Sequence, residues 1–224
     1  MEIFLDTANI MEISHILKWG IIDGVTTNQK IFLNEKGTDF KTRIKAICDL
    51  VDKRPVSVES NGSTLKEILD DARTFTKLAD NVVAKVPMIK DGTGLEAVNI
   101  LSKEGIKTNV TVMMNFNQLM LASKAGATYI SLFYNRAKDA GEDAISTVKN
   151  ITSWLNYNNY KTKLIVGSIR KPGDVEEAAN AGAHIITIPY KIMIAMPYHS
   201  KTEETIEEFD KAWKEFLAQQ KVRN

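Results

Sequence analysis

The sequence predicts an α/β protein, a (β/α)8 barrel with one additional C-terminal helix, and three observations lead to this prediction. Short apolar runs alternate with longer segments of helical period, which is the pattern of parallel strands joined by helices. Eight such units within 224 residues fit a TIM barrel in size. The rival, a doubly wound sheet, normally carries a glycine-rich loop after its first strand, whereas Leu5-Asp6-Thr7-Ala8-Asn9 contains no glycine.

The expected strands are short and rich in β-branched residues, and the expected helices are longer and amphipathic. Gly105, Gly126 and Gly182 each follow a helix and precede a strand, where a left-handed helix end is favoured. No linker, low-complexity tract or repeat occurs, so residues 1–224 are expected to form one domain. Strands are expected at 3–6, 24–27, 56–59, 82–86, 107–111, 129–133, 164–168 and 185–188. Helices are expected at 10–19, 38–51, 64–78, 95–103, 118–124, 142–156, 175–181 and 203 to about 219.

The composition is that of an ordinary soluble globular protein, 44% hydrophobic and 25% charged with a net charge of +1. This charge gives no reason to expect nucleic acid or an anionic membrane as a partner. The single cysteine, Cys48, excludes an internal disulfide framework. No signal-peptide pattern or long apolar window is present, so a cytoplasmic location is expected. His15, His184 and His199 are widely separated, and no metal site is expected.

The fourth expected strand contains a lysine inside the apolar run Val82-Val83-Ala84-Lys85-Val86. Lysine is seldom buried without a partner, because its charged form loses hydration. Burial favours the neutral amine, which can attack a carbonyl group and form a Schiff base. The alternative is that Lys85 lies at the end of the strand and extends its ammonium group into water.

Polar side chains also stand at the carboxyl ends of the other expected strands, where the active sites of such barrels lie. Several form pairs two residues apart, so both members lie on one face of their strand. An amine, two carboxylates, hydroxyls and amides at one mouth suit carbonyl chemistry through an imine. Two arginines after strands six and seven, together with a serine, suit a phosphate group. The residues concerned are Asp6, Thr26, Asn28, Ser57, Glu59, Asn109, Thr111, Ser131, Phe133, Arg136, Ser168 and Arg170.

Each of these residues has an ordinary structural explanation when it is considered alone. Asp6 could cap the helix that follows it, and Glu59 could lie on a loop surface. Asn28 could serve a turn, Thr111 could be an ordinary strand threonine, and the two arginines could be surface charges. The convergence of these residues at one end of the barrel favours the catalytic interpretation.

A set of motifs runs through the chain in a fixed order. They are Phe4-Leu5-Asp6-Thr7-Ala8, Gly24-Val25-Thr26-Thr27-Asn28, Val83-Ala84-Lys85-Val86-Pro87, Thr108-Asn109-Val110-Thr111, Ser131-Leu132-Phe133-Tyr134-Asn135-Arg136, Gly167-Ser168-Ile169-Arg170 and Phe209-Asp210-Lys211-Ala212-Trp213. With these motifs the chain resembles the transaldolase family, nearly from end to end. The likeness is greatest to its short, single-barrel branch, which also contains the fructose-6-phosphate aldolases.

The resemblance implies a class I transaldolase of the pentose phosphate pathway, which moves a dihydroxyacetone unit between sugar phosphates through a lysine Schiff base. It implies no cofactor and no metal. The implied substrates are fructose 6-phosphate, sedoheptulose 7-phosphate, erythrose 4-phosphate and glyceraldehyde 3-phosphate. By the same resemblance, Lys85 is the Schiff-base lysine, Asp6 is the acid/base, and Glu59 and Thr111 order a catalytic water. The implied substrate contacts are Thr26, Asn28, Asn109, Ser131 and Phe133, with Arg136, Ser168 and Arg170 at the phosphate.

Two positions separate the branches of this family. Fructose-6-phosphate aldolases resemble one another in having Gln where this chain has Glu59, and Tyr where it has Phe133. A tyrosine hydroxyl would help to protonate the intermediate and release free dihydroxyacetone, which phenylalanine cannot do. An aldolase that uses free dihydroxyacetone is therefore the alternative, followed by a catalytically reduced relative that binds sugar phosphates or only assembles. Gln29-Lys30 and Ile89 depart from the family pattern and bear on substrate fit.

The last expected helix, at about residues 202–220, carries an apolar stripe of Ile206, Phe209, Trp213 and Phe216. A barrel needs only eight helices, and a segment around 190–196 already follows the last strand. The stripe alone favours packing on the chain's own barrel. The resemblance instead implies packing on a neighbouring subunit, and a homo-oligomer that is a pentamer or decamer.

Overall fold

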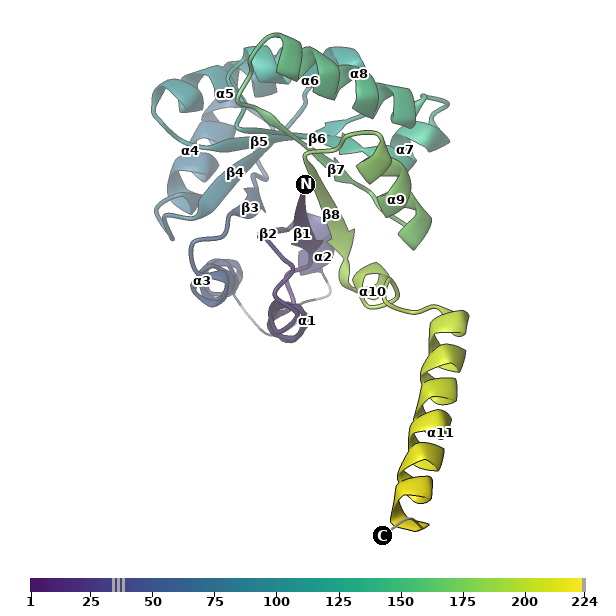
Figure 1. Cartoon of the computed structure of the whole chain (residues 1–224). Helices are drawn as coiled ribbons and strands as arrows, with labels where there is room; N and C mark the ends of the chain where they lie inside the picture. Colours follow the sequence, from purple (N-terminus) through teal and green to yellow (C-terminus); the bar gives the residue numbers. More distant parts are fainter. Residues whose placement is uncertain (34, 36, 38, 223–224) are drawn as a thin grey trace. The chain divides into compact units, whose positions relative to one another are not determined.

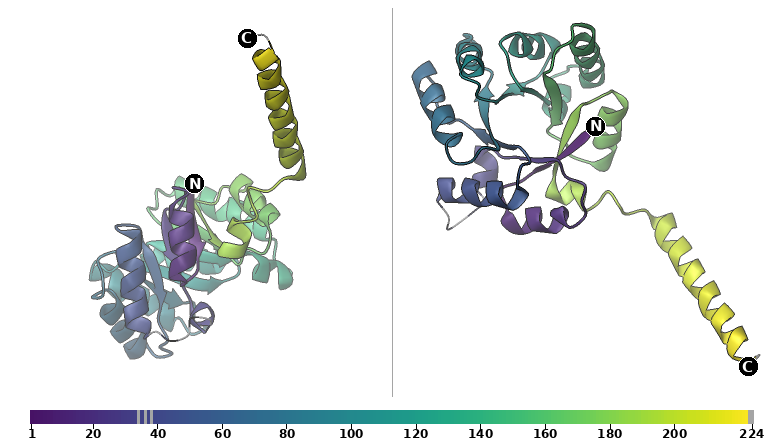
Figure 2. Two further views of the ribbon diagram at one scale, coloured as in Figure 1. Left: turned by 90° about the horizontal axis from the view of Figure 1, so that it is seen from below. Right: turned by 60° about the vertical axis from the view of Figure 1, so that its left-hand side comes forward.

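The structure is a computed structural model that describes residues 1–33, 35, 37 and 39–222. The chain forms two compact units, Met1–Met193 and Ile194–Asn224. The first unit is a closed barrel of eight parallel strands in chain order, with helices around the ring of strands (Figures 1 and 2). The predicted (β/α)8 barrel with a C-terminal helix is therefore confirmed.

The eight expected strands are all present, and their bounds differ from the expected ones by no more than two residues. Neighbouring strands pair in parallel, and pairing of β1 with β8, from Glu2 opposite Ile185 onward, closes the barrel. The strands are β1 Glu2–Asp6, β2 Gly24–Thr26, β3 Val56–Glu59, β4 Val82–Pro87, β5 Thr108–Met113, β6 Tyr129–Phe133, β7 Lys163–Gly167 and β8 Ile185–Pro189.

The main helices lie on the expected segments, and residue 38, where the second one was expected to begin, lies outside the described residues. Short helices α2 and α7 were not expected, because four to six residues are too few to show a helical period. The last helix of this unit, α10 Tyr190–Met193, occupies the expected segment. The others are α1 Ile10–Leu17, α2 Gln29–Phe32, α3 Phe40–Val51, α4 Leu65–Phe75, α5 Thr93–Lys103, α6 Phe116–Lys124, α7 Tyr134–Asp139, α8 Ala144–Tyr157 and α9 Pro172–Asn180.

The same turn between a helix and a strand occurs twice, at Ala125-Gly126-Ala127 and at Ala181-Gly182-Ala183. Gly126 and Gly182 have φ angles of 100° and 93°, a region that glycine enters without steric cost. The following residue donates its N–H to a carbonyl in the last helical turn, from Ala127 to Ala122 and from Ala183 to Ala178. These bonds satisfy carbonyl groups at the helix end and direct the chain into β6 and β8.

The barrel interior differs from one end to the other. At the amino ends of the strands it is apolar and filled by Phe4, Ile165 and Ile185. The Phe4 ring lies so near Gly24 that a Cβ there would meet it at 2.7 Å. Toward the carboxyl ends of the strands, the inward-facing residues become polar. The apolar half of the barrel interior is therefore closed, and the polar half is open.

The second unit contains α11, Ser200–Val222, which corresponds to the helix expected at about 202–220. Its apolar stripe is exposed, with Phe209 at 70% and Trp213 at 60%. The rings of Trp213 and Phe216 stack with centroids 5.4 Å apart. None of the described helices is long and apolar enough to cross a membrane.

Candidate active site

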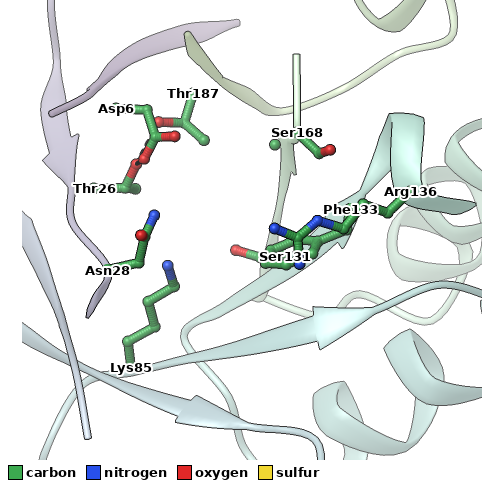
Figure 3. A pocket seen from close by; sticks show the side chains of 10 residues that line it. Asp6, Thr26, Asn28, Lys85, Ser131, Phe133, Arg136, Ser168 and Thr187 are labelled. Carbon is green, nitrogen blue, oxygen red and sulfur yellow. Dashed lines mark hydrogen bonds between the residues drawn. The ribbon is translucent and has the colours of Figure 1, made fainter. Parts of the chain in front are cut away.

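The carboxyl ends of the strands surround a cavity of about 90 Å³ (Figure 3). A wider cavity of about 530 Å³ shares Asp6, Asn28, Phe133 and Arg136 with it. The inner cavity is also lined by Thr26, Lys85, Ser131, Gly167, Ser168 and Thr187. The wider cavity is also lined by Gln29, Lys30, Ile31, Glu59, Val112 and Pro189.

Lys85 is buried, with 5% of its surface exposed. Its Nζ donates to the backbone carbonyl of Thr27 at 3.1 Å and lies 3.4 Å from a carboxylate oxygen of Glu59. The register of β3 and β4 places Glu59 directly beside Lys85, so two paired strands fix this contact. The amine therefore does not extend into water, and its charged form depends on the carboxylate next to it.

Asp6 faces the same cavity from β1. Its Oδ1 accepts the Thr26 hydroxyl at 2.8 Å, and that hydroxyl also contacts the hydroxyl of Thr187. Because the single proton of Thr26 is donated to Asp6, Thr187 must donate to Thr26. Burial raises the pKa of Asp6 above its ordinary value of 3.8, against the opposing effects of nearby Lys85 and of the Thr26 hydrogen bond. The carboxyl group therefore holds its proton more tightly than an exposed aspartate does.

Helix α1 is capped by Asn9 and not by Asp6. The side-chain oxygen of Asn9 accepts the backbone N–H groups of Met11 and Glu12. Asp6 is thus left to the cavity, and the capping explanation of this residue is wrong. In the same way, the side chain of Asn28 caps the short helix α2 by accepting the N–H of Ile31 while it lines the cavity.

A buried polar layer supports the cavity floor. Asn109 is fully buried, donates from Nδ2 to Ser57 Oγ at 3.1 Å and accepts the Ser131 hydroxyl at 2.7 Å. Ser131 lines the inner cavity, whereas Asn109 lines neither cavity. In this arrangement Asn109 orients Ser131.

Thr111 lies on β5 opposite Pro87, and its buried hydroxyl hydrogen-bonds to no described residue. Immediately after it, the pairing of β5 with β6 shifts register. Val112 at this irregularity has a φ of 62°, which is rare for a β-branched side chain. Val112 lines the wider cavity, so the irregularity adds an apolar wall to the mouth.

The structure separates the two arginines that were expected at the phosphate. Arg136 lines both cavities, and its guanidinium carbon lies 4.8 Å from the centroid of the Phe133 ring. Arg170 lines neither cavity and forms an ion pair with Asp139, with Nη1 at 3.0 Å from Oδ1. Strand β7 ends at Gly167 and Ser168 has a φ of 62°, so the strand alternation that would place Arg170 beside Ser168 stops there.

Thr187 is the main cavity residue that the sequence analysis missed. It is the one polar residue in Ile185-Ile186-Thr187-Ile188, which is the same signal that drew attention to Lys85. No three His, Cys, Asp or Glu side chains gather into a group able to hold a metal ion anywhere in residues 1–33, 35, 37 and 39–222.

A closed barrel with a buried lysine, two carboxylates and several hydroxyls at the carboxyl ends of its strands has the architecture of a barrel enzyme. Residues 3–223 match the family model described as transaldolase/fructose-6-phosphate aldolase. A probable transaldolase of Caldicellulosiruptor saccharolyticus is 46% identical over 214 residues, which cover 95% of this chain and 97% of the relative. A probable transaldolase of Streptococcus pyogenes serotype M2 is 44% identical over 216 residues, 96% of this chain and 99% of the relative. The chain belongs to the transaldolase/fructose-6-phosphate aldolase family, and the predicted resemblance is confirmed.

Proposed function

We propose that this protein is a transaldolase that moves a dihydroxyacetone unit between sugar phosphates through a Schiff base on Lys85. The observation that carries the proposal is the buried Lys85 amine 3.4 Å from the Glu59 carboxylate, in a cavity lined by hydroxyl and amide groups. We place the reaction in the pentose phosphate pathway of the cytoplasm. The substrates are fructose 6-phosphate, sedoheptulose 7-phosphate, erythrose 4-phosphate and glyceraldehyde 3-phosphate.

The first step joins the donor ketone to the enzyme. Lys85 gives a proton to Glu59, and the neutral amine attacks the carbonyl carbon of the donor. The carbinolamine then loses water, and an iminium forms. The buried Thr111 hydroxyl has no hydrogen-bond partner among the described residues, and we assign it a role with Glu59 in moving the protons of this step.

The second step breaks the C3–C4 bond of the donor. Asp6 accepts the proton of the C4 hydroxyl, the aldose phosphate leaves, and the bonding electrons move to the iminium nitrogen. A carboxyl group whose pKa is raised by burial suits this exchange, because acid/base catalysis works best near the operating pH. Thr26 orients Asp6 through its hydroxyl, and we assign Asn28 and Ser131, which line the same cavity, to the sugar hydroxyls.

The third step decides between transfer and release. The enamine attacks an acceptor aldehyde, Asp6 returns the proton, and water releases the new ketose from Lys85. Phe133 lines the cavity and has no proton to donate to the enamine. This supports transfer of the dihydroxyacetone unit to an acceptor aldehyde over its release as free dihydroxyacetone. An aldolase that releases or uses free dihydroxyacetone is the alternative.

Arg136 and Ser168 are the groups that we assign to the substrate phosphate. Both line the inner cavity, on the side away from Asp6 and Lys85 (Figure 3). A guanidinium group binds phosphate through charge-assisted hydrogen bonds. Arg170 lines neither cavity, so we expect it to contribute less to phosphate binding than Arg136 does.

Borohydride reduction in the presence of fructose 6-phosphate tests the proposal. A dihydroxyacetone-derived mass should appear on Lys85, and an adduct on another lysine would contradict the mechanism. Product analysis should then show a new ketose phosphate when erythrose 4-phosphate is added, and little free dihydroxyacetone without it. Equal release of dihydroxyacetone with and without the acceptor would favour the aldolase.

We also propose that the chain assembles as a homo-oligomer of five or ten copies through α11. The support is the exposed apolar stripe of this helix, including Phe209 and Trp213. Apolar side chains grouped on one face mark an interaction surface more often than a free surface. A neighbouring copy would cover this stripe.

A further inference from the structure

Two side chains behind the cavity wall join the elements that carry Arg136 and Ser168. Asn135 precedes Arg136 in α7 and is 8% exposed. Its Nδ2 donates to the backbone carbonyl of Ser168 at 2.8 Å and to Oδ2 of Asp174 at 2.7 Å. One amide group thus connects the end of β6 with the turn after β7.

Asp174 completes this connection from the first turn of α9. It is fully buried, and the same Oδ2 accepts the backbone N–H groups of Arg170 at 2.8 Å and Lys171 at 3.1 Å. A single carboxylate oxygen therefore receives three donors, one from Asn135 and two from the turn that follows Ser168. Its other oxygen, Oδ1, accepts from no residue that the structure describes.

The turn held in this way has an unusual backbone. Ser168 has a φ of 62°, a left-handed conformation that residues other than glycine seldom adopt. Such a conformation persists only where surrounding contacts enforce it. The Ser168 carbonyl is directed to Asn135, and an amide donor on this oxygen reduces the repulsion that it would exert on a nearby anion.

We propose that Asn135 and Asp174 are positioning residues that hold Arg136 and Ser168 together in the arrangement that binds the phosphate of the substrate. The inference rests on the proposed function in one respect, which is that Arg136 and Ser168 contact phosphate. Capping of α9 explains only the hydrogen bonds that Asp174 accepts from backbone N–H groups at the start of the helix. The bond from Asn135 serves no helix end and ties α7 to the Ser168 turn.

Substitutions that remove the hydrogen bonds of Asn135 and Asp174 should weaken binding of phosphorylated acceptors more than binding of unphosphorylated ones. Asp174→Ala and Asn135→Ala should each raise KM for glyceraldehyde 3-phosphate by about tenfold, the effect of losing one charge-assisted hydrogen bond. KM for unphosphorylated glyceraldehyde should change by less than about twofold, and kcat should stay near the wild-type value with either acceptor. Asp174→Asn should recover part of the loss, since its amide oxygen can still accept the three donors.

Asp143→Ala is the matched control. Asp143 caps α8 by accepting the N–H and hydroxyl of Ser146, and it lines neither cavity. Its loss should lower Tm without changing the ratio of KM values for the two acceptors. In addition, Asp174→Ala should raise KM for glyceraldehyde 3-phosphate little further in an Arg136→Ala background. The effects of substituting two residues that act through one another are not additive.

Direct binding of inorganic phosphate, measured by calorimetry on the intact protein, separates this inference from the proposed function. Phosphate should bind the wild type and Asp143→Ala, and more weakly Asp174→Ala and Asn135→Ala. This result would support the inference even if borohydride trapped no adduct on Lys85, which would overturn the transaldolase proposal alone. Absence of phosphate binding to the wild type would overturn the inference, as would equal losses for the two acceptors. If Asp174→Ala does not fold, Asn135→Ala and Asp174→Asn decide by the same readouts.

Discussion

The Nζ of Lys85 lies 3.4 Å from the Glu59 carboxylate, and the two side chains are only 6% and 12% exposed. Because both side chains have lost most of their hydration, the charge on each is stabilised by the opposite charge on the other. Asp6 shares the cavity, where burial raises its pKa against the opposing effects of Lys85 and of the Thr26 hydroxyl. Two carboxylates around one amine therefore have different environments, as expected when one serves the amine and the other the substrate.

Lys85→Met should lower turnover by about three orders of magnitude or more, since it removes the nucleophile. Steady-state transfer from fructose 6-phosphate to erythrose 4-phosphate measures this, and circular dichroism should show that the barrel is retained. Lys107→Met is the control, because Lys107 is exposed at the opposite end of the barrel and should keep full activity. Turnover by Lys85→Met close to the wild-type rate would exclude the Schiff base.

Asp6→Asn should stabilise the protein at neutral pH while it lowers turnover by about 10²–10⁴-fold. The raised pKa means that the folded state keeps a proton where the unfolded carboxyl has lost it. The stability from this proton is complete below pH 3.8, the ordinary value, and is lost as the pH rises through the raised pKa. Asparagine does not titrate and can still accept the Thr26 hydroxyl.

Thermal unfolding across a pH series checks the sign of this effect. Relative to the wild type, the Tm of Asp6→Asn should increase steadily from about pH 4 toward neutrality. A Tm difference that does not vary with pH would show that Asp6 has an ordinary pKa.

Phe133→Tyr should increase release of free dihydroxyacetone relative to transfer, because a phenol in the cavity offers a proton to the intermediate. The ratio of the two products, measured at fixed acceptor concentration, reports the change. Phe133→Leu is the control, since it removes the ring without adding a donor. An active tyrosine variant with the wild-type ratio would remove the reason for preferring a transaldolase over an aldolase.

Arg136→Ala should raise KM for phosphorylated acceptors by roughly 10–150-fold, the equivalent of about 1.5–3 kcal/mol for a hydrogen bond to a charged group. Arg170→Ala should have a smaller effect, because its guanidinium is paired with Asp139 and lines neither cavity. Unphosphorylated acceptors serve as the reference for both variants. A larger effect at Arg170 would mean that this side chain leaves Asp139 when substrate binds.

Trp213→Glu in α11 should divide the assembly into smaller species, since a charge would be buried where an apolar surface is covered. Light scattering on the wild type should give five or ten times the monomer mass of 25.1 kDa. Lys211→Glu, on another face of the helix, should leave the mass unchanged. A wild-type mass near that of one chain would exclude the oligomer.

The sequence by itself determined the barrel, because the alternation of apolar runs and helical segments is a local signal repeated eight times. It also predicted that Lys85, Asp6 and Glu59 lie at the same end of the barrel, and all three line the cavities there. A polar residue inside an apolar strand, such as Lys85, needs a partner, and strand parity shows which side it faces. Short helices such as α2 and α7 were missed, because they have no period to detect.

Only the tertiary structure decided which of the expected residues meet. The register between β3 and β4 places Glu59 beside Lys85, and strand pairing across a barrel is not encoded in spacing along the chain. The left-handed backbone of Ser168 turned Arg170 away from the cavity and toward Asp139. The bonds of Asn135 to Ser168 and Asp174 link residues 33 and 39 positions apart. Contacts over such separations depend on how the whole barrel closes, and for this reason the chain's local pattern could not reveal them.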